Sequence, residues 1–467
     1  MYTIIGAGLT GLAIADHFKK NDIEFEIYEG KEHGGGHVFS EKINGFTWDE
    51  GPHVSFAKTK YVKDYFATNC QDQYLEFDTN PSNYYKNTWI PHPAQSHLYA
   101  VPESIRYLTI TEIKKIRSVH PENYEAKNYK QWLTHAFGES FTEHFPETYT
   151  IKYWTTSSEN LSTDWIGDRV YFPNLEDVLS SAKGPLSKQT HYISKIRYPK
   201  TGGFYSFIKS VEKLIPVQYN KKISFLSFEN KEIKFEDGTK INYENLVSTI
   251  PLVEMILKSD APEEIKEQAG ILNCSQLLLV NVIVNHATPI PNEWVYVYDK
   301  EMYSTRINFT ELLSPENGAV GKTGIQVEVY FSAYREIKED INTIAEKVLT
   351  ELIEMKLIER KELIESYHTK WINWANVIFD NTRRDAQNII FNWLATMGLT
   401  REYDDLEPMT NWDEKFQRPE PCGQIILAGR FAQWKYFWTE DCVLRALFIA
   451  QSIVSSMPAN KEQIGLP

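Results

Sequence analysis

The sequence predicts an α/β protein with a discontinuous Rossmann-like dinucleotide-binding domain, a mainly helical insertion and an antiparallel-sheet substrate domain. Three observations lead to this prediction. The chain starts with a strand, a glycine turn, a helix and a second strand; a long helical and aromatic stretch follows; and a run of strands occupies residues 271–335. The chain has 467 residues, more than one hydrophobic core usually supports, so two or three domains are expected.

The N-terminal unit has the order strand, helix, strand. The β-branched run YTII predicts a strand, the turn GAGLTG follows, and a helical stretch continues to about Lys20. The segment FEIYE then predicts a second strand, which ends at Glu29. This order forms a βαβ unit.

Three glycines in this unit have the spacing of a dinucleotide-binding motif. Gly6 permits a tight turn, Gly8 lets the backbone approach a phosphate, and Gly11 lets helix and strand pack closely. The helix N-terminus would then bind a pyrophosphate. Glu29 would accept hydrogen bonds from the adenosine ribose, which favours FAD or NAD over NADP. An ordinary turn with an exposed glutamate is the alternative.

A second glycine cluster favours FAD over NAD. Gly35 and Gly36 follow the acid, and such a pair is usual in FAD proteins that resemble amine oxidases and protoporphyrinogen oxidase. His37 comes next, where oxidases often carry arginine. A glycine-rich surface loop is the alternative interpretation.

The later segments complete the expected elements. Residues 60–190 are mostly helical and aromatic, and residues 223–251 predict strands joined by a turn at Asp237–Gly238. A helix is expected to start near Thr343, which has capping-box spacing with Glu346.

The segment GQIILAG near the end of the chain predicts a buried strand in the same sheet as the first strand. A helix from about Glu440 to Ser456 is expected after it. We therefore expect an FAD-binding domain, a mainly helical substrate-binding insertion and an antiparallel-sheet domain. The FAD-binding domain is expected to comprise residues 1–60, 190–270 and 395–467. The insertion spans residues 61–189, and the antiparallel-sheet domain spans residues 271–394.

Composition limits the class of protein. The net charge of −14 and the pI of about 5.4 argue against a broad nucleic-acid or anionic-membrane surface. No signal peptide or membrane-spanning segment is expected. Four scattered cysteines without CxxC spacing fit a reducing, cytoplasmic location and predict no metal site.

Several short motifs resemble those of the UDP-galactopyranose mutase family, within the wider group of amine oxidase-like FAD proteins. The segment GFTWDEGPHVSF resembles the family segment that ends in Gly-Gly-His, which implies that His53 lies near the isoalloxazine. The segment TWIPHPAQ carries the matching Gln95. The segment TYTIKYW resembles the uridine-site helix, which implies that Tyr149 and Trp154 flank the base.

The same resemblance assigns further residues. It implies that Arg169, in WIGDRV, and Arg306 bind the diphosphate, with Tyr296 and Tyr436 on the substrate side. It also implies flavin-site positions at Gly202, Gly203, Gly429 and Arg430.

Physical chemistry supports these residue types. A nucleotide sugar carries two negative charges on its diphosphate, and each charge-assisted bond from an arginine contributes about 1.5–3 kcal/mol. The planar fork of arginine fits phosphate oxygens better than lysine does. Taken singly, each residue has a plainer interpretation: Arg169 as a surface ion pair, Tyr149 and Trp154 as core residues, and His53 as a loop histidine.

One position departs from the family pattern. After Tyr436, bacterial mutases have an acidic residue two positions on, whereas this chain has the bulky, apolar Trp438. The substitution bears on which sugar the site would accept.

The resemblance implies an FAD-dependent mutase that interconverts pyranose and furanose forms of a UDP-galactose-like sugar through N5 of the reduced flavin. His53, Arg169 and Arg306 would be its catalytic residues, and a small-molecule nucleotide sugar would be its partner. The alternatives are an FAD-dependent oxidase or desaturase resembling protoporphyrinogen oxidase or amine oxidase, and a flavoprotein that serves in binding or assembly. Whether the chain forms a homo-oligomer is left open.

Overall fold

A parallel five-stranded sheet forms one end of the molecule. The computed structural model describes the chain except residues 120–123, 187–189, 191–192, 194, 403–421 and 457–467. The strand order is β19-β13-β1-β2-β9, and every pairing is parallel. The strands are β1 (Tyr2–Ile5), β2 (Phe25–Tyr28), β9 (Val217–Gln218), β13 (Asn245–Ser248) and β19 (Ile425–Leu427). The expectation that the first strand and the IILAG strand share one sheet is confirmed, with β13 between them.

Helices from both ends of the chain pack beside this sheet. Helix α1 (Leu9–Lys20) packs against α16 (Thr439–Ser456), and α8 (Lys209–Leu214) and α2 (Lys60–Asn69) lie nearby. The α1 side chains Leu12, Ile14 and Phe18 are completely buried. All residues from Leu9 to Phe18 are buried, so α1 is covered on every side, by the sheet, by α16 and by α8.

A small antiparallel sheet lies next to the parallel one. Its strands are β10 (Ile223–Ser227), β11 (Glu232–Phe235) and β12 (Lys240–Asn242). At the expected Asp237–Gly238 turn, Gly238 has φ +82° and donates its N–H to the Phe235 carbonyl at 3.0 Å. Three helices accompany this part: α9 (Leu252–Leu257), α10 (Glu263–Ile271) and α13 (Arg383–Thr396).

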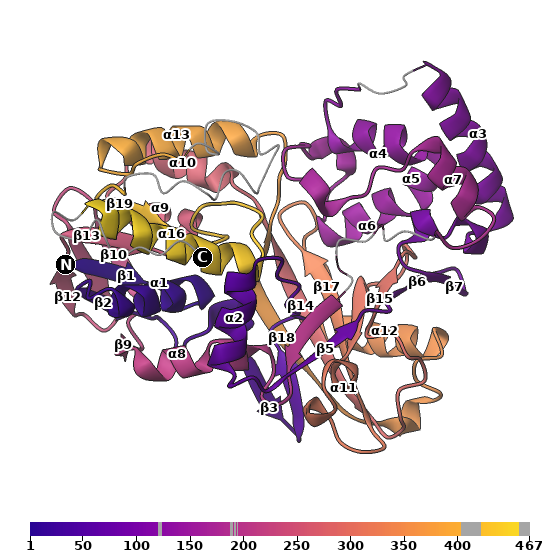
Figure 1. The fold of residues 1–467 in the computed structure, drawn as a ribbon, viewed down its shortest axis with the longest axis horizontal. Helices are drawn as coiled ribbons and strands as arrows, with labels where there is room; N and C mark the ends of the chain where they lie inside the picture. Colours follow the sequence, from indigo (N-terminus) through magenta and orange to yellow (C-terminus); the bar gives the residue numbers. More distant parts are fainter. Residues whose placement is uncertain (120–123, 187–189, 191–192, 194, 403–421, 457–467) are drawn as a thin grey trace.

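A seven-stranded sheet of order β18-β14-β17-β16-β15-β6-β7 forms the middle of the molecule (Figure 1). Its pairings are antiparallel except β15 with β6. The strands are β6 (Ser82–Tyr85), β7 (Thr88–Pro91), β14 (Cys274–Val284), β15 (Trp294–Val297), β16 (Arg306–Phe309), β17 (Thr323–Phe331) and β18 (Ile364–Val377). The run of strands expected between residues 271 and 335 is confirmed.

Helix α12 (Ile341–Glu354) packs its apolar face on this sheet, and its start differs from the expectation. Asp340 caps the helix by accepting the Asn342 N–H at 2.8 Å. The helix expected to start near Thr343 therefore begins two residues earlier, at Ile341, because Asp340 and not Thr343 provides the cap.

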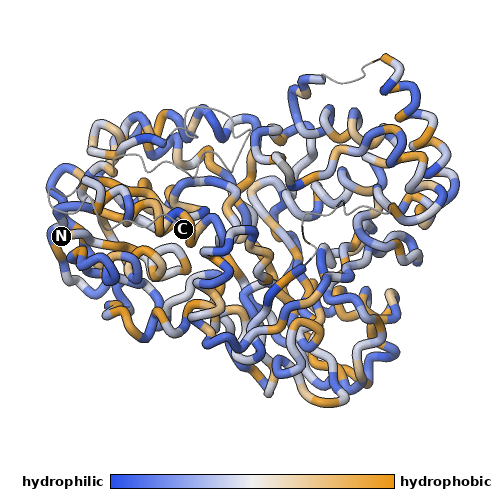
Figure 2. Tube along the Cα trace, viewed as in Figure 1, coloured by the Kyte–Doolittle hydropathy of each residue, from blue (hydrophilic) through white to orange (hydrophobic). Residues whose placement is uncertain are grey.

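The helical insertion lies at the upper right of Figure 1. Its helices are α3 (Glu103–Val119), α4 (Tyr129–Phe137), α5 (Glu139–His144), α6 (Pro146–Tyr153) and α7 (Leu175–Ser181). Figure 2 shows hydrophobic and hydrophilic residues alternating along them, as amphipathic helices require. Strands β5 (Tyr74–Asp78), β6 and β7 precede these helices, although helix was expected there; β5 pairs with β8 (Lys195–Pro199). Within the described residues, no helix is both long and apolar enough to cross a bilayer.

We expect Gly11→Ala to disrupt the joint between β1 and α1. A Cβ at Gly11 would lie 2.0 Å from the Gly6 carbonyl oxygen, and Gly6 itself needs φ +94°. The unfolding free energy should fall by about 1–3 kcal/mol or more, and the bound dinucleotide should be lost with it. Thermal melting and cofactor absorbance per mole of protein measure both effects.

Gly270→Ala, in helix α10, is the matched control. A Cβ there meets nothing within 4 Å, so the substitution should leave stability unchanged or raise it by about 0.5–1 kcal/mol. Equal melting temperatures for the two variants would contradict the proposed close approach.

Candidate active site

One cavity of about 1020 Å³ joins the dinucleotide motif to residues expected on the substrate side. Its lining includes four positions that the sequence assigned to catalysis or substrate binding: His53, Tyr296, Arg306 and Tyr436. It also includes these predicted cofactor positions: Gly6, Gly8, Glu29, Gly35, Gly36, Gly429 and Arg430. The fold therefore brings residues from across the chain to a single site.

The dinucleotide end is built from the carboxyl ends of β1 and β2. The Glu29 carboxylate follows β2 and accepts the N–H groups of Ala7 at 2.7 Å and Lys31 at 2.9 Å. These bonds fix the carboxylate beside the glycine turn. Gly8 caps α1 without a side-chain hydrogen bond, so the first N–H groups of the helix remain for a ligand.

These features fit FAD. The turn, the ribose carboxylate and the helix N-terminus are the groups that hold the adenosine and pyrophosphate of a dinucleotide. The cavity continues from them to aromatic side chains at Trp294, Tyr296 and Tyr436, which suit a planar ring system.

The Gly202–Gly203 loop does not line the cavity. It leads into Phe204, whose N–H donates to Asp49 Oδ1 at 3.0 Å. Asp49 also accepts the Ser40 and Tyr198 hydroxyls, and burial raises its pKa to about 6. The loop therefore packs behind the β3 (Ser40–Ile43) and β4 (Phe46–Asp49) hairpin.

His53 is a neutral histidine at the cavity wall. Its Nδ1 lies 2.8 Å from the Gly51 carbonyl oxygen, which can only accept, so Nδ1 carries the proton. Burial lowers the pKa of His53 to about 4, with further lowering from His37, Arg430 and Arg306. Nε2 is therefore left as a hydrogen-bond acceptor at neutral pH.

Arg306 forms a two-bond ion pair with Glu328 across the register of β16 and β17. Nε and Nη2 each donate to one carboxylate oxygen at 2.7 Å, and the Glu328 side chain is only 2% exposed. Burial opposes the charge on Arg306, but Glu328 outweighs it and raises the pKa of Arg306 well above its usual value. Arg306 is therefore permanently charged, and Nη1 remains outside the pair.

Arg169 contacts the site through aromatic side chains. Its guanidinium lies 4.8 Å from the centre of the Tyr436 ring and 4.5 Å from that of the Trp438 ring, and both rings line the cavity. Nη2 donates to the Tyr436 carbonyl at 2.8 Å, and Nη1 to the Trp165 carbonyl at 3.0 Å. Arg169 itself does not line the cavity.

The remaining predicted substrate residues lie at different depths. The Tyr149 ring packs edge-on against Tyr296 at 5.4 Å, so it borders the cavity wall. Burial raises the pKa of Tyr149 well above its usual value, which keeps the phenol protonated. Trp154 is 4% exposed and belongs to the aromatic core, and Gln95 lies in a 3-10 turn outside the cavity lining.

Sequence reasoning missed several cavity residues. Glu328 and Tyr330 line the cavity from the face of β17 that also carries Gln326, and Asn376 lies near the end of β18. Alternating polar residues in a strand whose residues are all buried mark one face of that strand. This period-2 pattern in IQVEVYF was the available signal.

The N-terminal region matches a known domain family. Residues 4–68 match the model described as the NAD(P)-binding Rossmann-like domain. The matched region contains the glycine turn, Glu29 and the Gly35–Gly36 loop, in agreement with the dinucleotide end of the cavity.

Solved structures extend the similarity to nearly the whole chain. A reduced UDP-galactopyranose mutase superposes with a TM-score of 0.85 at 20% identity, over 97% of this chain and 93% of the other. A putative protoporphyrinogen oxidase from Exiguobacterium sp. 255-15 gives 0.70 at 15% identity, over 97% and 98%. A double mutant of putrescine oxidase gives 0.61 at 12% identity, over 97% and 98%.

The chain therefore has the fold that this mutase and these oxidases share. Its similarity to UDP-galactopyranose mutase confirms the resemblance that the short motifs indicated and the predicted α/β fold class. Together with the cavity, the Rossmann-like match supports FAD as the cofactor.

We expect His53 to remain neutral and protonated on Nδ1 from pH 6 to pH 8. Since its folded pKa of about 4 lies below the usual 6.5, it should gain its second proton only in acid. Nitrogen-15 NMR of histidine-labelled protein, with His53→Gln to assign the signal, measures the tautomer and the titration. An imidazolium signal from His53 at pH 6 would contradict this assignment.

Proposed function

We propose that the chain is an FAD-dependent mutase that interconverts pyranose and furanose forms of a UDP-galactose-like nucleotide sugar. The observation that carries the proposal is the charged Arg306–Glu328 pair in the same cavity as the dinucleotide motif. A partly buried arginine in a cavity that tyrosines also line suits an anionic, hydroxyl-rich substrate.

The residues of this chain have separate tasks in the proposed reaction. Glu328 fixes the Arg306 guanidinium, so that Nη1 can donate to a diphosphate oxygen without reorganising. The hydroxyls of Tyr296 and Tyr436 can bond phosphate or sugar oxygens while their rings pack in the wall. His53 can accept a proton or a hydrogen bond at Nε2. The bound cofactor would supply its reduced isoalloxazine as the nucleophile.

The second candidate is an FAD-dependent oxidase or desaturase. Trp438, Phe437 and Phe56 line the cavity, and the Phe56 and Trp438 rings meet edge-on at 4.9 Å. These rings suit an apolar or amine substrate, and the fold is shared with oxidases. The Arg306–Glu328 pair favours the mutase, because an apolar substrate needs no such charge.

Turnover on nucleotide sugars tests the proposal. The full-length protein would be incubated anaerobically with UDP-galactose and related nucleotide sugars, with and without dithionite, and the products separated by chromatography. We expect an isomer of unchanged mass only with reduced cofactor. Absence of any isomer, together with oxygen consumption on amine or apolar substrates, would favour the oxidase.

Arg306→Lys should lower kcat/KM on the nucleotide sugar roughly 10- to 150-fold, because lysine keeps the charge but loses the planar fork. Arg197→Lys is the matched control: Arg197 has a similar side-chain exposure, pairs with Glu76 at 2.6 Å and lies outside the cavity lining. The control should retain full activity. If both variants were equally active, Arg306 would not bind the substrate as proposed.

A further inference from the structure

His37 follows a glycine loop that lies against the turn expected to bind the pyrophosphate. The loop that carries it is tied to the glycine turn, since the Gly35 N–H donates to the Ala7 carbonyl at 2.8 Å and Gly35 forms a parallel bridge with Gly8. A Cβ on Gly36 would lie 3.0 Å from the Cα of Gly8. The next residue, His37, lines the cavity.

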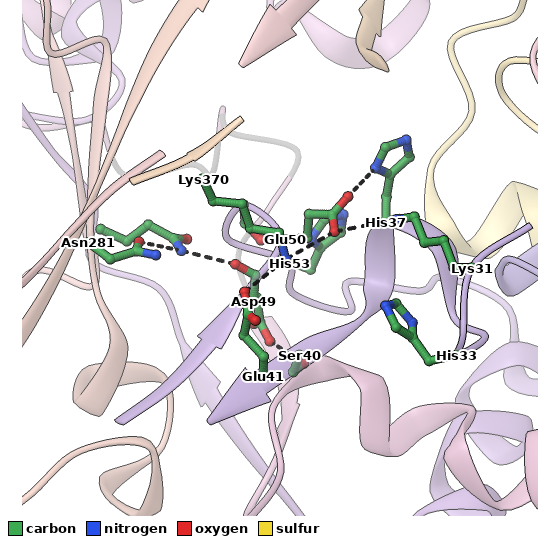
Figure 3. A network of polar contacts seen from close by, with 12 residues as sticks. Lys31, His33, His37, Ser40, Glu41, Asp49, Glu50, His53, Asn281 and Lys370 are labelled. Carbon is green, nitrogen blue, oxygen red and sulfur yellow. Dashed lines mark hydrogen bonds and ion pairs between the residues drawn. The ribbon is translucent and has the colours of Figure 1, made fainter. Parts of the chain in front are cut away.

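One ring nitrogen of His37 is held by a carboxylate. Nδ1 lies 2.9 Å from Glu50 Oε1 (Figure 3). The ring also packs edge-on against Phe431, with the ring centres 5.6 Å apart. Among the described residues, nothing bonds Nε2, and the His37 side chain is 38% exposed. An imidazole oriented by a carboxylate at Nδ1 has Nε2 available for a ligand.

When the His37 imidazole is neutral, the charges of the lysines and carboxylates near it cancel. Glu50 lies 3.3 Å from Lys370 and 3.9 Å from Lys31, and Lys370 also pairs with Glu41 at 2.8 Å. With a neutral imidazole these two lysines and two carboxylates sum to zero, whereas an imidazolium makes the cluster cationic. A pyrophosphate carries two negative charges, so its presence favours the imidazolium.

We propose that His37, held by Glu50, binds the pyrophosphate of the cofactor as an imidazolium, so that cofactor binding takes up a proton. The inference rests on the proposed FAD cofactor. It assigns to a titratable histidine the place where oxidases often carry a permanently charged arginine.

The other groups that face His37 keep their charge near neutral pH. Burial would raise the pKa of Glu50, but His37, Lys31 and Lys370 hold it at about 2. Burial opposes the charge on Lys370, but Glu41 and Glu50 raise its pKa.

His53, the other histidine among the lining residues, is neutral because burial lowers its pKa to about 4. His37 is the lining histidine with one ring nitrogen held by a carboxylate and Nε2 unbonded among the described residues, so we assign the proton uptake to it.

The pH dependence of FAD affinity tests the inference. FAD would be titrated into deflavinated full-length protein, followed by flavin fluorescence, from pH 6 to pH 8.5. We expect the affinity to fall as pH rises, by at most tenfold per pH unit for one proton. Calorimetry in buffers of different ionisation enthalpy should show net proton uptake on binding.

Three variants identify the responsible group. His37→Gln should bind FAD more weakly, with a flat pH profile and no proton uptake, whereas His37→Arg should keep the affinity at pH 8 and also lose the pH dependence. His33→Gln is the matched control from the same loop. His33 stacks on Phe39 at 3.6 Å, bonds the Gly34 carbonyl and does not line the cavity, so this variant should behave as wild type.

Two outcomes would overturn the inference while leaving the proposed function intact: pH-independent affinity of the wild type, or a wild-type pH slope in His37→Gln. Failure of the wild type to bind FAD at any pH would instead overturn the proposed cofactor, and this inference with it.

Discussion

Parallel pairing of β1, β2, β13 and β19 is the constraint on which the site depends. Strands that run in one direction end at one edge of their sheet, and each carboxyl end here delivers a part of the cavity. The glycine turn follows β1, Glu29 follows β2, Thr249 follows β13, and Gly429 follows β19. Segments more than 400 residues apart in sequence thus meet around one ligand position through the backbone pairing of this sheet.

At the substrate end of the cavity the main constraint is different: the charge of a buried side chain must be neutralised by a partner. Arg306 and Glu328 lie opposite each other on β16 and β17, so the antiparallel register gives the guanidinium its partner before any ligand arrives. An unpaired charge at this depth would be costly, and removing one member of such a pair usually destabilises by about 3–5 kcal/mol. The pair therefore lets a strongly polar group persist in a cavity that the apolar rings of Trp438 and Phe437 also line.

The sequence predicted best the features that depend on local patterns. The glycine turn, Glu29 and the Asp237–Gly238 turn are fixed by neighbours in the chain, and short β-branched runs marked most strands of both sheets. Glu328 and the His37–Glu50 pair were missed because their roles come from strand register and from loops that meet in space. Strands β5 and β6 were missed because they gain partners from β8 and β15, far along the chain, and β7 then pairs with β6. The placement of Trp154 in the aromatic core likewise follows from packing that no local motif encodes.

The close packing of α1 against α16 has a consequence for how the protein is made. The first helix to leave the ribosome meets its partner only when residues 439–456 have been synthesised, and β19 joins the parallel sheet only shortly before that. The N-terminal βαβ unit must therefore wait, with its apolar face uncovered, while most of the chain emerges. Premature termination before residue 425 would leave a product whose nucleotide-binding sheet lacks its edge strand and whose first helix lacks its cover. Such truncated chains should be substrates for chaperones and proteases rather than partially active enzymes.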